Sequence, residues 1–122
     1  MVERLFTYGS LMPGREYAHL LAEAGDDWQE ASLTGFVDSD GWGHSVGYPA
    51  LLVHEAGFKI SGMVVTSGNL HKLWPLLDDF EGPAYQRTTT EVVLANGARV
   101  IAFVYELNTA LQPRVRQQLG LT

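Results

Sequence analysis

The sequence predicts an α+β fold in which a small, mostly antiparallel β-barrel is flanked by two or three helices. Three observations support this prediction. Five or six strand-like runs are interspersed with two or three helical patterns. The pair Asn96-Gly97 between two such runs is a strong hairpin signal. Residues 48–53 and 100–105 are apolar on both faces, so these strands need cover on two sides, from a closed barrel and from helices.

The first third of the chain predicts strand, helix and strand. Residues 2–8 form an apolar run typical of a strand, and residues 31–37 predict another. Between them, residues 15–24 predict a helix that ends at Gly25, where a left-handed backbone is favoured. The helix has an apolar stripe at helical spacing, made of Tyr17, Leu20, Leu21 and Ala24. Residues 38–47 contain three glycines and predict an irregular loop, either a long surface connection or a lid or specificity loop.

The middle of the chain predicts a hairpin followed by a helix. Residues 48–54 and 59–66 are strand-like and are separated by the short turn 55–57. Residues 70–81 predict a helix with Ser67 or Asn69 as its N-cap. Pro75 interrupts this pattern, so we expect a kink or two short helical pieces, the second beginning at Pro75.

The last part of the chain predicts a second hairpin and a short terminal helix. The strands of the hairpin are residues 85–94 and 99–107, and the helix is residues 113–119. With 122 residues, no internal repeat and no linker, the whole of 1–122 is expected to be a single domain.

Composition narrows the function. The formal net charge of −6 and the lack of a basic cluster argue against a nucleic-acid partner. The chain has no cysteine, which excludes disulfides and thiolate metal sites. Its four histidines lack ligand spacing, so no metal is expected. Neither a signal peptide nor a run of membrane-spanning length is present, so we expect a soluble cytoplasmic protein with no membrane partner.

The loop after the first strand is a candidate anion site. The strand breaks at Gly9-Ser10 and the loop closes on Pro13-Gly14, just before the first predicted helix. A small glycine-bounded loop that leads into a helix leaves several backbone N–H groups without partners at one place. Such converging amides bind anions, and the start of the helix adds positive potential.

A carboxylate on the second helix is the candidate for chemistry. At about 100° per residue, Glu81 falls within about 20° of Leu70 and so continues the inward apolar stripe. Asp79 points nearly opposite, towards water. An inward carboxylate near like charges and a helix C-terminus is expected to have a raised pKa, which suits a general acid/base. The alternative is a structural ion pair between Glu81 and Arg87.

Four short motifs follow one another along the chain: Tyr8-Gly9-Ser10-Leu11, Tyr48-Pro49-Ala50, Asp78-x-x-Glu81-Gly82 and Tyr85-x-Arg87. Each is weak alone, but with their order and separation the chain resembles the gamma-glutamylcyclotransferase-like family over nearly its whole length. The resemblance implies a small β-barrel flanked by helices. It also implies an enzyme that cyclises a γ-glutamyl group, forming 5-oxoproline and releasing an amine or an amino acid.

The resemblance also assigns roles to residues. It implies Glu81 as the general acid/base and the backbone of the 8–11 loop as the holder of the glutamyl group. It implies a small-molecule γ-glutamyl substrate, with neither metal nor cofactor, because the substrate supplies its own nucleophile. The resemblance does not identify the leaving group or the oligomeric state. The candidate substrate-binding residues are Tyr8, Gly9, Ser10, Leu11, Tyr48, Tyr85, Arg87 and Tyr105.

Three rival interpretations remain at this point. Ser10 as a nucleophile would need His19 as its base, but His19 lies off the apolar stripe and the loop lacks a Gly-x-Ser-x-Gly elbow. Asp78 and Glu81 are too close in one helix to flank a sugar as glycosidase carboxylates do. The third rival is a non-catalytic member of the family that binds a small acidic metabolite or a protein partner.

Substitutions in the loop separate the two enzyme interpretations. We expect Ser10→Ala to cause only a modest loss of 5-oxoproline formation, because the loop's amides remain when a side chain is removed. Gly9→Val should be worse, since a branched residue obstructs the backbone angles or the close approach expected there. The measurement is 5-oxoproline release by each variant. Complete loss in Ser10→Ala with intact folding would revive the serine nucleophile.

Overall fold

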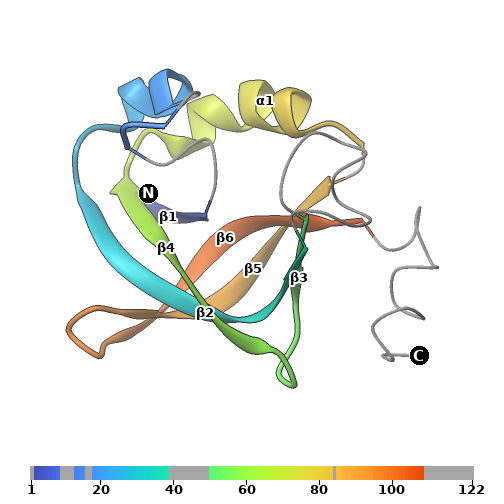
Figure 1. Cartoon of the computed structure of the whole chain (residues 1–122). Helices are drawn as coiled ribbons and strands as arrows, with labels where there is room; N and C mark the ends of the chain where they lie inside the picture. The colour runs from blue at the N-terminus through green and yellow to red at the C-terminus, as the bar shows by residue number, and fades with distance from the viewer. Residues whose placement is uncertain (1, 9–12, 16–17, 39–49, 84, 109–122) are drawn as a thin grey trace.

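Six strands and two helices make up most of the described chain (Figure 1). The structure is a computed structural model that describes residues 2–8, 13–15, 18–38, 50–83 and 85–108. In chain order the elements are β1 (Glu3–Thr7), the 3₁₀ helix η1 (Ala18–Ala24), β2 (Trp28–Asp38), β3 (Ala50–Val53), β4 (Phe58–Ser67), α1 (Leu70–Glu81), β5 (Tyr85–Leu94) and β6 (Arg99–Leu107).

Five of the strands close into a barrel. Their order is β2-β4-β1-β6-β5, and pairing of Ala31 with Leu94 and of Ser32 with Val93 joins β5 back to β2. Each of these pairings is antiparallel except that of β1 with β6. The predicted small, mostly antiparallel barrel with flanking helices is therefore confirmed, and the predicted hairpin of β5 and β6 is present with both strands at their expected bounds.

The predicted hairpin of the two middle strands is wrong. β3 and β4 do not pair with each other, because both pair with β2, on its opposite edges. Gly35 of β2 lies opposite Val53 of β3 and also opposite Phe58 of β4, so the short turn between these strands crosses β2 at that point. A Cβ on Gly57 would overlap the carbonyl oxygen of Gly35. The crossing therefore depends on two glycines in close approach.

The helices differ from their predictions in two respects. The first is a 3₁₀ helix over Ala18–Ala24. Arg15, the expected first residue, is not helical, and residues 16 and 17 lie outside the described part of the chain. Gly25 ends this helix with φ +96°, as predicted. The second spans the predicted residues Leu70–Glu81 as one helix, so the expectation of two pieces beginning anew at Pro75 is wrong. Pro75 is exposed, which lets water serve the carbonyl that lacks a helical partner. Neither of these helices has the length and apolar character needed to cross a membrane, among the residues described.

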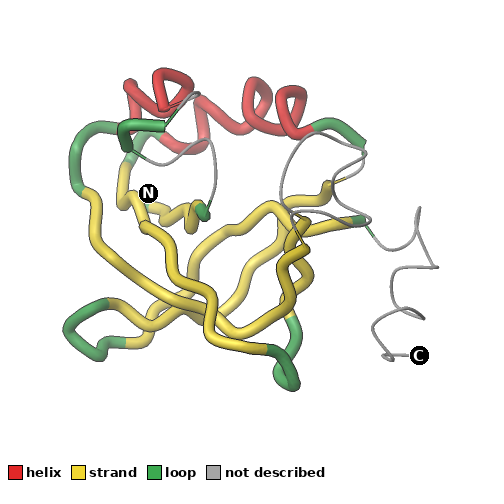
Figure 2. Tube along the Cα trace, viewed as in Figure 1, coloured by secondary structure: helices red, strands yellow, loops and turns green. Residues whose placement is uncertain are grey.

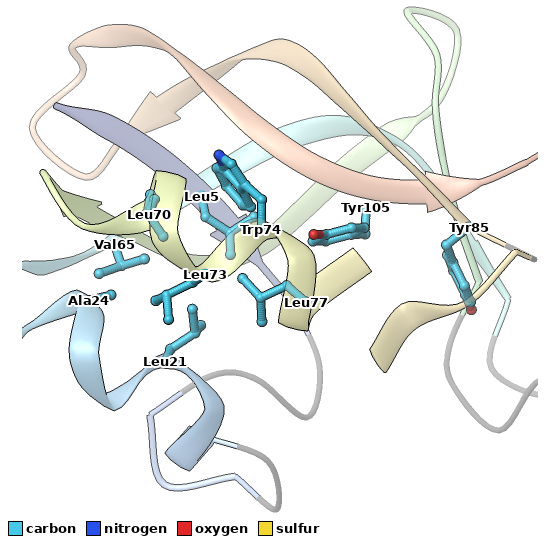
Figure 3. Packing of buried hydrophobic residues seen from close by; sticks show 10 residues of the cluster. All are labelled: Leu5, Leu21, Ala24, Val65, Leu70, Leu73, Trp74, Leu77, Tyr85 and Tyr105. Atoms are coloured by element: carbon cyan, nitrogen blue, oxygen red, sulfur yellow. The ribbon is translucent and has the colours of Figure 1, made fainter. Parts of the chain in front are cut away.

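Both helices lie at the same end of the barrel (Figures 1 and 2). One apolar cluster lies between them and the sheet and includes Leu21, Leu70 and Leu77 (Figure 3). A second cluster contains Phe6, Val64 and Val104. Since successive strand residues face opposite ways, neighbours on a strand divide between the clusters. The clusters divide Leu5 from Phe6 on β1 and Val104 from Tyr105 on β6.

The two faces of β6 are not both buried along the whole strand. Ile101, near the β5–β6 turn, is 60% exposed, whereas Ala102 and Val104 are buried. The expectation that residues 100–105 are covered on two sides is therefore wrong at the end of the strand far from the helices. The helices lie over one end of the barrel only, so a strand that outruns them has one face in water.

The glycine crossing yields a stability prediction. Gly57→Ala places a methyl group against the backbone of Gly35, so we expect it to lower the free energy of unfolding by about 1–3 kcal/mol. Urea denaturation measures this, with Glu55→Ala in the same exposed turn as the control. A Gly57→Ala protein as stable as the control would mean that the crossing is not tightly packed.

Candidate active site

Glu81 is the last residue of α1, and Gly82 follows it with φ +76°. As predicted, Asp79 is exposed while Glu81 is partly buried. Burial removes water from the carboxylate and raises the pKa of Glu81 from 4.5 to about 7. Like charges and the end of the helix were also expected to raise this pKa, but the structure gives desolvation as the cause.

The expected alternative partner of Glu81 is engaged elsewhere. Nη2 of Arg87 lies 3.6 Å from Oδ2 of Asp78, and no ion pair joins Arg87 to Glu81 in the described part of the chain. The guanidinium also stacks on two aromatic rings, 4.3 Å from the centre of Trp74 and 5.6 Å from that of Phe103. Arg87 is thus held by Asp78 and by these rings, so it does not neutralise Glu81 directly.

Glu81 acts electrostatically on two tyrosines, Tyr8 and Tyr105. The pKa of Tyr8, just after β1, is raised well above 10, first by burial and then by Tyr85, Glu81 and Glu106. The pKa of Tyr105 is raised by burial, by its hydrogen bond to Asp78 and, more weakly, by Glu81. Residues from β1, α1, β5 and β6 therefore converge on one end of the barrel.

Tyr105 is tied to the same helix turn that carries Glu81. Its hydroxyl donates a hydrogen bond of 2.5 Å to Oδ1 of Asp78, and Arg87 lies directly opposite Tyr105 in the β5–β6 ladder. Tyr105 belongs to the apolar cluster beneath α1 (Figure 3). Asp78 thus links α1 to neighbouring residues on both strands. The sequence placed Asp78 in a motif but did not assign it this contact.

Glu106 is a further residue that sequence reasoning missed. Its Oε2 accepts a hydrogen bond of 2.9 Å from the backbone N–H of Val53. This bond fastens the edge of β3, away from β2, to the end of β6. Glu106 also acts on Tyr8 electrostatically. An acidic residue in an otherwise apolar strand end was the available signal, but its partner is 53 positions away.

Two hollows in the described surface are candidates for a binding site. A cavity of about 520 Å³ is bordered by Asp78, Tyr85, Arg87 and Tyr105. A larger hollow of about 780 Å³ lies over β2, β4 and the β5–β6 turn, and none of the five predicted site residues that the structure describes lines it. Size favours the second hollow. The first hollow is bordered by Tyr105, whose pKa is raised, but neither Glu81 nor Tyr8 lines it. We favour the end of the barrel that carries these three groups, because perturbed pKa values are the better indicator of chemistry.

The structure therefore brings together five of the nine predicted site residues, namely Tyr8, Glu81, Tyr85, Arg87 and Tyr105. Gly9, Ser10, Leu11 and Tyr48 lie outside the described residues, as do most of the 38–47 loop and the predicted helix 113–119. The roles of all nine residues stay predictions.

The raised pKa of Glu81 makes a signed prediction about stability. Between its ordinary value of 4.5 and about 7, the folded state binds a proton that the unfolded state lacks, so stability falls as the pH rises. We therefore expect Glu81→Gln to raise the free energy of unfolding at pH 8 by about 1–3 kcal/mol. The gain should vanish below a pH of about 4.5, where both side chains are neutral.

Urea denaturation at the two pH values measures this effect. Asp79→Asn is the matched control, because it removes an exposed charge from the same helix turn. A Glu81→Gln protein that is less stable than this control at pH 8 would contradict the desolvation of Glu81.

Comparison with known proteins gives a consistent picture. A family model described as gamma-glutamyl cyclotransferase, AIG2-like, matches residues 5–120. Among solved structures, YkqA from Bacillus subtilis is 27% identical with a TM-score of 0.69, over 88% of this chain and 36% of that one. An AIG2-like protein from Mus musculus is 24% identical with a TM-score of 0.70, over 88% and 78% of the two chains.

A structure named gamma-glutamyl cyclotransferase shares the fold at 17% identity and a TM-score of 0.57, over 88% of this chain and 68% of that one. This chain spans only about a third of the length of the Bacillus protein. A search of curated proteins found no match. The family model covers almost the entire chain, and the barrel agrees with it: the protein belongs to the gamma-glutamyl cyclotransferase, AIG2-like family.

Proposed function

We propose that the protein is a cyclotransferase that converts a γ-glutamyl compound into 5-oxoproline and a free amine or amino acid. One observation carries the proposal. The pKa of Glu81 is raised to about 7, and Glu81 acts electrostatically on Tyr8 and Tyr105 at one end of the barrel, in a family described as gamma-glutamyl cyclotransferase, AIG2-like. A carboxyl group near neutrality can both accept and return a proton at physiological pH.

Glu81 takes up one proton and delivers one during the proposed reaction. Glu81 accepts a proton from the substrate's α-ammonium group, and the free amine attacks the γ-carbonyl carbon of the same molecule. A new C–N bond closes the five-membered ring, and the C–N bond to the leaving amine breaks. Glu81 then returns its proton to the departing nitrogen. The attacking nitrogen loses its second proton as it becomes the ring amide, and that proton passes to the released amine or to solvent, so the enzyme ends the cycle unchanged.

Substrate positioning supplies the rest of the catalysis. Holding the γ-glutamyl chain folded for ring closure is worth about 7–11 kcal/mol in favourable cases. The backbone amides of Gly9, Ser10 and Leu11 are proposed to hold either the substrate's α-carboxylate or the developing oxyanion, and both alternatives stay open. Either way, the amides bind negative charge while Glu81 handles the ammonium group.

The test is 5-oxoproline release from a panel of γ-glutamyl amino acids, γ-glutamylamines and glutathione. We expect at least one donor to be turned over and Glu81→Gln to lower kcat by about 10²–10⁴-fold, the usual contribution of general acid–base catalysis. Asp79→Asn is the control and should retain activity. Because the amine is deprotonated by ionised Glu81, kcat/KM of the wild type should rise with pH through about 7.

The outcomes separate the candidate functions. Release of no product from any donor would favour a non-catalytic binding protein for a small acidic metabolite or a protein partner. Turnover that survives Glu81→Gln would reject Glu81 as the acid/base and leave the fold assignment intact.

A further inference from the structure

The hydrogen bond between Tyr105 and Asp78 has a fixed direction. The Tyr105 hydroxyl donates the 2.5 Å hydrogen bond to Oδ1 of Asp78, so the proton in this contact belongs to the hydroxyl. The other carboxylate oxygen of Asp78 lies 3.6 Å from Nη2 of Arg87. The hydroxyl proton of Tyr105 is therefore committed to Asp78. The phenolic oxygen can then act only as a hydrogen-bond acceptor, through its lone pairs.

The oxygen lies within electrostatic reach of Glu81. Tyr105 is 5% exposed, and Glu81 is among the groups that raise its pKa. Asp78 and Glu81 are three positions apart on α1, which puts them on neighbouring parts of the same helix surface. A group bound beside Glu81 would thus meet an acceptor on the helix and a second acceptor on β6.

Arg87 keeps this arrangement in place. Its guanidinium is stacked on Trp74 of α1 and Phe103 of β6, the two elements that Asp78 and Tyr105 join. Because Arg87 lies opposite Tyr105 in the ladder, the hydroxyl and the guanidinium approach Asp78 from adjacent strands. Asp78 thus has its two oxygens occupied by different partners, Oδ1 by Tyr105 and Oδ2 by Arg87.

We propose that Asp78 is a positioning residue that holds the Tyr105 hydroxyl as a hydrogen-bond acceptor for the substrate's α-ammonium group, beside Glu81. This inference rests on the proposed function and deepens it, since it adds a second acceptor for the α-ammonium group and a residue that positions this acceptor. At this point two acceptors favour a cationic donor over a carboxylate. The α-carboxylate must then bind elsewhere. The donor nearby is Nη1 of Arg87, which is buried and has no hydrogen-bond partner among the described residues, and it suits an anionic group.

A purely structural role would have different consequences. If the Asp78–Tyr105 bond only fastened α1 to the barrel, its loss would weaken binding of every ligand alike. If it presents an acceptor to an ammonium group, its loss would weaken only ligands that carry that group. The sharp comparison is therefore between L-glutamate and glutarate, which differ in the α-ammonium group.

The experiment measures dissociation constants of L-glutamate and glutarate by NMR titration of the full chain. The variants are Tyr105→Phe, Asp78→Ala and the double variant, and thermal denaturation checks that each is folded. The matched control is Asp79→Ala, which removes a carboxylate of the same helix turn that faces water. This readout requires no turnover.

We expect the wild type to prefer L-glutamate, and Tyr105→Phe to reduce that preference roughly 10- to 100-fold, as for a hydrogen bond to a charged group. Asp78→Ala should reduce it roughly 10-fold, and the double variant should match Tyr105→Phe, because Asp78 acts through Tyr105. Asp79→Ala should leave the preference unchanged. Absence of any preference in the wild type, equal effects of the two aspartates, or additive losses in the double variant would overturn the proposal.

The result also separates this inference from the proposed activity. A preference for L-glutamate that is lost as expected, without 5-oxoproline from any donor, supports the inference and rejects the activity. Glu81-dependent turnover with Asp78→Ala behaving like Asp79→Ala supports the activity and rejects the inference.

Discussion

The burial of the apolar stripe of α1 against the barrel is the constraint on which the site depends. Leu70, Leu73, Trp74 and Leu77 must face the sheet to cover one face of its strands. The helix period then turns Glu81 the same way, so a carboxylate is carried partly out of water by the packing of its neighbours. The fold accepts this cost because the stripe gains more from burial than one desolvated carboxylate loses. A near-neutral pKa is the chemical consequence.

The pKa of Glu81 stays raised because Arg87 pairs with Asp78 and not with Glu81. Had Arg87 paired with Glu81, the opposite charge would have returned the carboxyl pKa towards or below its ordinary value. Arg87 instead pairs with Asp78 and stacks on the rings of Trp74 and Phe103. The same pairing leaves Asp78 as the acceptor of the Tyr105 hydroxyl. One acidic residue of the turn, Asp78, is therefore engaged by Arg87 and Tyr105, and another, Glu81, is desolvated, a division that suits a site with a single acid/base.

The barrel serves the site by bringing distant strands to one end. The long strand β2 is shared by β4 on one edge and by β5 and β3 on the other, which closes the barrel and leaves β3 to be fixed separately. Glu106 fixes it through the N–H of Val53, using a side chain where a sixth barrel strand would use its backbone. The crossing of β2 by the β3–β4 turn requires the close approach of Gly35 and Gly57. Ladder pairing and glycine packing thus set where Tyr8 and the ends of β5 and β6 meet.

The sequence by itself determined the elements whose signals are local: the bounds of α1, the β5–β6 hairpin, the inward direction of Glu81 and, through short motifs, the family. Those features follow from helix period, turn chemistry and residue order, which a single chain displays. Only the tertiary structure decided that β3 and β4 both pair with β2, that the first helix is 3₁₀, that Arg87 joins Asp78, and that Glu106 holds Val53. These outcomes are competitions between partners far apart in sequence. Their winners depend on distance, burial and charge in three dimensions, which periodicity does not encode.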